Sequence, residues 1–176
     1  MKYERMPIET IESLGLQIPN LKLLYNEHRG ETELRKLIAE DANVSADDVL
    51  ITSGVAGALF IITTSQLGST NAGEHNHLVV VRPNYATNLE TPRAIGCEIS
   101  YIDVTFESDF QPNIDEIEDA IKPNTWLVSV TCPHNPIGST LSREALDRLV
   151  TVTKKKGVLL LVDETYRDIA FVRSFL

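Results

Sequence analysis

Four short stretches of this 176-residue chain contain residue types suited to binding a flat, charged ligand. The segment 52–57 is rich in small residues, so its backbone can approach a ligand closely, and helix N–H groups that follow it would attract a phosphate. Tyr85 offers an aromatic face for stacking, and Asn135, between prolines, offers an amide for hydrogen bonding. Asp163 and Tyr166 supply a carboxylate and a phenol.

Each stretch also has an ordinary structural interpretation. The segment 52–57 lacks both the Gly-Lys-Ser/Thr ending of a P-loop and the G-x-G-x-x-G dinucleotide pattern. Tyr85 and Tyr166 could pack in a core, the loop Cys132–Gly138 could be a proline-rich turn, and Asp163 could cap a helix. Their positions relative to the predicted secondary structure favour a shared role.

The hydrophobic pattern predicts strands alternating with helices. Short apolar runs rich in β-branched residues predict buried strands at Val49–Thr52, Leu78–Arg82, Glu98–Ile102, Trp126–Val130 and Val158–Val162. Longer stretches predict helices at Glu31–Ala42, Val55–Leu67, Ala86–Ile95, Ile114–Ile121 and Ser142–Lys156. This alternation predicts an α/β fold, a mainly parallel sheet with helices on both faces. Ligands of such sheets bind beyond the carboxyl ends of the strands, where the four stretches would converge.

Composition narrows the possible partners. The formal charge is −9, with 43% hydrophobic and 23% charged residues. An acidic surface argues against nucleic acid and membrane surfaces as partners. The longest apolar run, Val55–Ile62, is too short to span a bilayer. Cys97 and Cys132 lack zinc-like spacing, and His75-Asn76-His77 is expected to be an exposed loop, so we expect no metal site and a cytoplasmic protein.

The motifs, in order, resemble those of class I/II aminotransferases, which are pyridoxal-phosphate (PLP) enzymes of fold type I. The resemblance is carried by Tyr25 to Arg35, Thr52 to Leu59, Gly73-Glu74, Pro83-Asn84-Tyr85, Pro133 to Gly138 and Asp163 to Tyr166. It implies that residues 49–176 are part of the PLP-binding large domain. It also implies that residues 1–48 form an N-terminal segment with one helix, on the dimer-contact and small-domain side.

The resemblance assigns the cofactor's phosphate to backbone N–H groups around Gly54, Val55 and Ala56. Tyr25 resembles a tyrosine that reaches the phosphate bound by the neighbouring subunit, which implies a homodimer with a shared site.

The remaining residues of the resemblance surround the pyridine ring of pyridoxal 5′-phosphate. Tyr85 would stack on the ring, while Asn135 and the Tyr166 hydroxyl would bond its phenolic oxygen. Asp163 would pair with the ring nitrogen and keep it protonated, so that the ring can accept electrons.

The implied activity is amino-group transfer between an amino acid and a 2-keto acid. Family members use a Schiff-base lysine in a Ser-x-x-Lys context beyond the Asp-x-x-Tyr motif, and no lysine here has that context. We therefore assign no catalytic residue and expect the 176 residues alone to be inactive. The expected protein partner is a second copy of the chain, in a homodimer, or a complementing C-terminal portion. Alternatives are another fold type I PLP enzyme (C–S lyase, decarboxylase or synthase) and a non-catalytic PLP-binding or interaction module.

Overall fold

The computed structural model describes residues 25, 27–67 and 75–169, which fall into two compact units, Met1–Ile51 and Thr52–Leu176. In the first unit, helix α2 (Thr32–Ala42) is followed by a short 3₁₀ turn, η2 (Ala46–Asp48). Glu31 caps α2 by accepting the Leu34 N–H at 2.7 Å. The buried Arg35 then ties the helix to the turn by donating to the Ala46 carbonyl at 2.8 Å.

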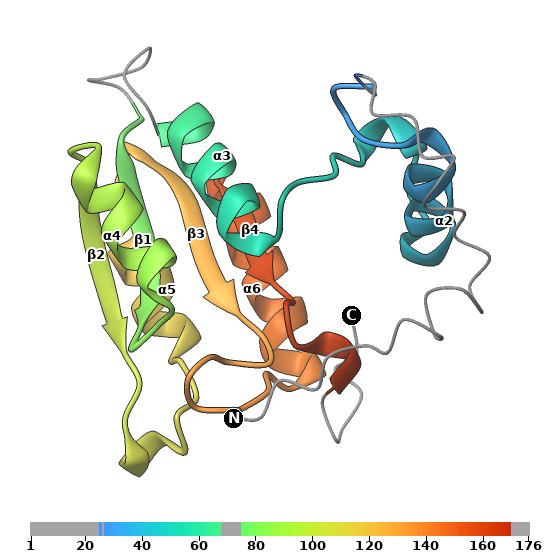
Figure 1. The fold of residues 1–176 in the computed structure, drawn as a ribbon. Coiled ribbons are helices and arrows are strands. Elements are labelled where there is room, and N and C mark those ends of the chain that lie inside the picture. Colours follow the sequence, from blue (N-terminus) through green and yellow to red (C-terminus); the bar gives the residue numbers. More distant parts are fainter. Residues whose placement is uncertain (1–24, 26, 68–74, 170–176) are drawn as a thin grey trace. The chain divides into compact units, whose positions relative to one another are not determined.

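The second unit alternates helices and strands as predicted (Figure 1). Its strands are β1 (His77–Arg82), β2 (Glu98–Asp103), β3 (Thr125–Thr131) and β4 (Leu159–Asp163). Its helices are α3 (Val55–Leu67), α4 (Ala86–Ala94), α5 (Ile114–Ala120) and α6 (Arg143–Lys156), with 3₁₀ turns η4 (Phe106–Ser108) and η5 (Arg167–Ile169). No helix in this described part of the chain is long and apolar enough to cross a membrane.

The four strands form one parallel sheet in the order β2-β1-β3-β4. The chain moves outward from β1 to β2, and then crosses β1 to continue in the opposite direction through β3 and β4. The direction of winding therefore changes between β1 and β3. A crevice at the carboxyl ends of the strands is expected at that point, because the loops there leave toward opposite faces of the sheet.

Helices cover both faces of the sheet, which confirms the predicted α/β architecture (Figure 1). Alternate residues of β1 point to opposite faces, as strand geometry requires. Val79 and Val81 join a core with residues of α5 and α6, including Ile117 and Leu149. On the other face, Leu78, Val80 and Leu127 pack with residues of α3 and α4, including Leu67 and Leu89.

The predicted strand at Val49–Thr52 is wrong. This segment follows η2 without belonging to any helix or strand. Among the described residues before α2, its backbone is joined to Arg29, whose carbonyl accepts the Ile51 N–H at 3.0 Å. An apolar β-branched run supplies strand propensity, but a strand also needs a partner for its ladder of hydrogen bonds.

His77 lies in the sheet and not in an exposed loop, which corrects the expectation for His75-Asn76-His77. The His77 side chain is completely buried, with Nδ1 2.6 Å from Thr125 Oγ1 and Nε2 2.9 Å from Ser100 Oγ. Thr125 Oγ1 already accepts the Lys122 N–H, so its own hydrogen is available to donate to Nδ1. With Thr125 as the donor to Nδ1, a neutral ring has its proton on Nε2 and donates it to Ser100 Oγ, and burial favours this neutral form.

We predict that protonation of His77 destabilises the fold. Burial, with a smaller effect of Lys122, lowers the His77 pKa below its ordinary value of 6.5. The unfolded chain therefore binds this proton more readily than the folded one, and the stabilisation is full above pH 6.5 and declines as the pH falls below it. Urea unfolding at several pH values should show a smaller acid-induced loss of stability in His77→Gln than in the parent chain.

The matched control is His28→Gln, because the His28 side chain is exposed. Its pH dependence should equal that of the parent chain. An unchanged pH dependence in His77→Gln would contradict the assignment.

Candidate functional site

A cavity of about 130 Å³ lies where β3 and β4 end and α3 and α4 begin. It is lined by Val55, Tyr85, Thr131, Asn135, Asp163, Thr165 and Tyr166. Most of the predicted site residues are therefore brought together, although they come from segments more than 100 residues apart in the sequence. Gly54 and Ala56 adjoin Val55 in the chain, whereas Tyr25 belongs to the other unit, where its side chain is fully exposed.

The start of α3 contributes backbone N–H groups to this region. Gly54 has φ +83°, a conformation that favours glycine, and its carbonyl accepts the Ala58 N–H at 3.3 Å. The Gly54 N–H is already used, because it donates to the Thr52 carbonyl at 2.8 Å. The N–H groups of Val55 and Ala56 lie in the first turn, where a helix provides no acceptor for them. They are therefore better placed than Gly54 to bind an anion.

Asp163, the last residue of β4, places a buried carboxylate on the cavity wall. It is 6% exposed. Its Oδ1 accepts from the Thr165 N–H at 3.1 Å and from Thr165 Oγ1 at 2.6 Å, and its Oδ2 accepts from Asn88 Nδ2 at 3.4 Å. All three donors are neutral, and no ion pair of Asp163 is found among the described residues. A buried charge without a counter-charge is costly, so this wall favours a cationic ligand group.

Three other predicted residues are accessible at the cavity. Tyr85 and Tyr166 are 42% and 40% exposed, and Asn135 is partly buried. Asn135 lies on the loop after β3, which is closed by hydrogen bonds from the Gly138 N–H to the His134 carbonyl and from the His134 N–H to the Ser139 carbonyl. Two phenols and an amide thus line the same cavity as Asp163.

Sequence reasoning missed four residues that hold or line the site: Asn84, Asn88, Thr131 and Thr165. The most connected is Asn84, whose Oδ1 accepts from the Tyr85 N–H at 2.7 Å, Asn88 Nδ2 at 3.0 Å and Thr131 Oγ1 at 3.1 Å. Its Nδ2 donates to the Val81 carbonyl at 3.0 Å. Asn84 and Thr165 fall within recognised motifs and could have been assigned from them, whereas Asn88 has no local sequence signal.

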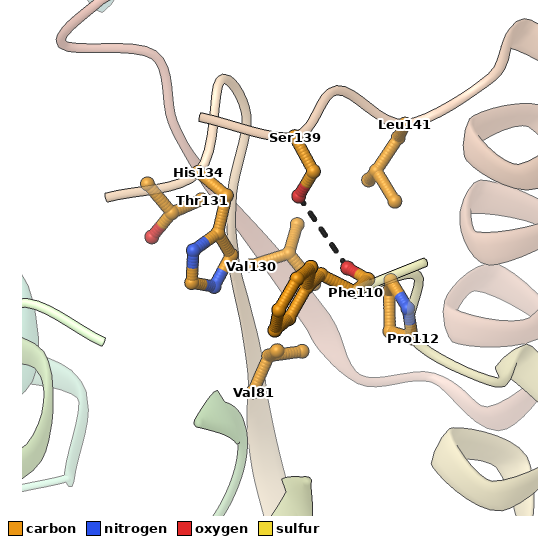
Figure 2. Close-up of a pocket in the computed structure, with 8 residues that line it drawn as sticks. All are labelled: Val81, Phe110, Pro112, Val130, Thr131, His134, Ser139 and Leu141. Carbon is orange, nitrogen blue, oxygen red and sulfur yellow. Dashed lines mark hydrogen bonds between the residues drawn. The ribbon is translucent and has the colours of Figure 1, made fainter. Parts of the chain in front are cut away.

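The loop that follows β3 also covers a second, much smaller cavity of about 10 Å³. His134 is one of the residues that line it (Figure 2). Figure 2 shows the hydrogen bond from Ser139 Oγ to the Phe110 carbonyl, 3.4 Å long, which ties the loop to the segment before α5. His134 is 6% exposed, and neither of its ring nitrogens has a partner among the described residues. Burial lowers the pKa of this imidazole and so favours its neutral form.

The comparison with protein families decides what kind of chain this is. A model of the family described as aminotransferase class I and II matches residues 15–175. The chain belongs to this aminotransferase family. Among the curated relatives, aspartate aminotransferase of Thermotoga maritima is 27% identical over 86% of this chain and 40% of its own length. Arginine–pyruvate transaminase of Pseudomonas aeruginosa is 28% identical over 84% of this chain and 38% of its own length.

Solved structures show the same fold. Alanine aminotransferase of Pyrococcus furiosus superposes with a TM-score of 0.80 at 25% identity, over 92% of this chain and 41% of that one. For Thermotoga maritima aspartate aminotransferase the TM-score is 0.79 at 26% identity, over 92% of this chain and 44% of that one. The sheet and helices are thus those of an aminotransferase large domain, and the chain spans less than half the length of these relatives.

We predict that Asn84→Leu lowers the free energy of unfolding of this aminotransferase-family chain by about 2–4 kcal/mol. The substitution leaves the buried Asn88 amide without one of its acceptors, and it removes three further hydrogen bonds. Urea unfolding followed by circular dichroism measures the loss. Asn124→Leu is the matched control, since the Asn124 side chain makes one exposed hydrogen bond, to Glu98. Equal losses in the two variants would show that Asn84 does not organise the site.

Proposed function

We propose that this chain is part of the pyridoxal 5′-phosphate-binding large domain of an enzyme that transfers an amino group between an amino acid and a 2-keto acid. Family membership supports the reaction class, and the relatives' names include aspartate, alanine and arginine–pyruvate aminotransferases. The observation that carries the cofactor assignment is the buried Asp163 carboxylate, which faces the cavity without a cationic partner among the described residues.

The cavity's donor set fits this cofactor at both of its charged ends. The N–H groups of Val55 and Ala56 at the start of the 13-residue helix α3 suit a phosphate. Asp163 suits the protonated ring nitrogen, because the carboxyl group is held in place by neutral donors and has no cationic partner among the described residues. When bound, pyridoxal phosphate supplies the electron-accepting ring that amino-group transfer requires.

The other residues of the cavity would orient the ring. The half-exposed Tyr85 would pack against its face, and Asn135 with the Tyr166 hydroxyl would donate hydrogen bonds to its phenolic oxygen. These contacts would restrict how a flat ligand rotates in the cavity and how deeply it enters, while Asp163 would recognise one edge of the ring. The exposed Tyr25 is proposed to reach the phosphate site of a second subunit in a homodimer.

We predict that Asp163→Asn weakens pyridoxal 5′-phosphate binding by about tenfold to a hundredfold, because the neutral amide removes the charge that would favour the protonated ring. Isothermal titration calorimetry at neutral pH measures the dissociation constants. Asp103→Asn is the matched control: it makes the same change in net charge at the same edge of the sheet, but Asp103 pairs with Arg82 and does not line the cavity. A similar loss in both variants would contradict the role of Asp163.

We also predict that these 176 residues bind the cofactor reversibly. No lysine lines the described cavity, and Lys154, Lys155 and Lys156 end α6, a helix whose C-terminus leads into the amino end of β4. Borohydride reduction followed by intact mass and peptide mapping should find no stoichiometric adduct. A single stoichiometric adduct on one lysine would identify a catalytic lysine within the chain and overturn the expectation of inactivity.

A further inference from the structure

Asn88 is a buried polar residue of α4 whose amide contacts the Asp163 carboxylate. The side chain is 4% exposed, and its Nδ2 lies 3.0 Å from Asn84 Oδ1 and 3.4 Å from Asp163 Oδ2. An amide nitrogen carries two hydrogens, so these two acceptors use both of them. The amide is therefore oriented at one end by Asn84, which itself is held by the Val81 carbonyl and Thr131.

This arrangement fixes both oxygens of Asp163 without neutralising the carboxylate. Thr165 holds Oδ1, and Asn88, from an element 75 residues away in the chain, holds Oδ2. A lysine or arginine in the place of Asn88 would supply similar hydrogen bonds but would cancel the negative charge. A neutral donor keeps the charge available to a ligand while restricting the rotation of the side chain.

We propose that Asn88 is a positioning residue for the cofactor: it acts through Asp163 to increase the preference of the cavity for a ligand with a protonated ring nitrogen. This inference rests on the proposed function, because it takes pyridoxal phosphate as the ligand. The inference goes beyond the proposed function because Asn88 is buried and does not line the cavity, yet it would control how the cavity recognises one atom of the ligand. Asn88 would thus determine selectivity for the ring nitrogen more than overall affinity.

The test uses two probes that differ in one ring atom. One is pyridoxine 5′-phosphate, whose alcohol cannot react with lysines, and the other is its analogue with a C–H in place of the ring nitrogen. Calorimetry gives the dissociation constant of each probe for the parent chain, Asn88→Leu and Asp163→Asn. Asn76→Leu serves as a matched control, because it makes the same change at the amino end of β1, away from the cavity.

The parent chain and Asn76→Leu should bind the pyridine probe more tightly than the carbon analogue, and Asp163→Asn should abolish that preference. Asn88→Leu should lose about tenfold in affinity for the pyridine probe with little change for the analogue. An equal loss for both probes would show that Asn88 only supports the packing of the cavity, and would overturn the inference.

Failure of the proposed function has a different signature. If the parent chain binds neither probe, or prefers neither, the cofactor assignment fails and the inference fails with it. If Asp163→Asn abolishes the preference while Asn88→Leu preserves it, the proposed function stands and only the role of Asn88 is wrong.

Circular dichroism verifies that each variant is folded. If Asn88→Leu does not fold, Asn88→Ala replaces it: the shorter side chain removes the donor to Asp163 Oδ2 without adding a charge. The preference for the pyridine probe should fall in this variant as well, and an unchanged preference would overturn the inference.

Discussion

The common direction of the four strands is the constraint on which the candidate site depends. In a parallel sheet all carboxyl ends lie at one edge, so residues after β1, β3 and β4 meet although 80 positions separate Tyr85 from Thr165. The change of winding between β1 and β3 then opens that edge, since α4 covers one face and α5 and α6 the other. Because β2 lies on the far side of β1, its terminal Asp103 pairs with Arg82 and remains outside the cavity.

Charge places opposite demands on the two ends of the cavity. A chain of net charge −9 repels a phosphate at long range, so a phosphate-bearing ligand needs local compensation. The first-turn N–H groups of α3 can supply it without any basic side chain. At the other end, the Asp163 carboxyl group, which is held by uncharged donors, would favour a protonated ring nitrogen. Anion binding at one end would therefore depend on the orientation of backbone N–H groups, and cation binding at the other end on Asp163.

The sequence predicted what depends on local patterns and missed what depends on tertiary partners. The four strands of the sheet begin and end close to their predicted bounds. Each strand is a short apolar run that can be recognised from neighbouring residues alone. Val49–Thr52 has the same apolar character but pairs with no strand in the described part of the chain. His77 looked polar and exposed, yet Thr125 and Ser100 satisfy its ring inside the sheet. Asn88 was missed for the same reason, since the acceptor that connects it to the site, Asp163, lies 75 residues away in the chain.

Exposure separates the accessible rings of the site from the buried polar groups that fix its geometry. Tyr85 and Tyr166 are about two-fifths exposed, whereas Asn88 and Asp163 are almost completely buried. The buried set is joined by hydrogen bonds that run from the Val81 carbonyl through Asn84 and Asn88 to Asp163. Such a network costs little rearrangement when a ligand binds, because its donors are already oriented. Selectivity would then be set by the rigid, buried part of the site, while the accessible rings supply contact area.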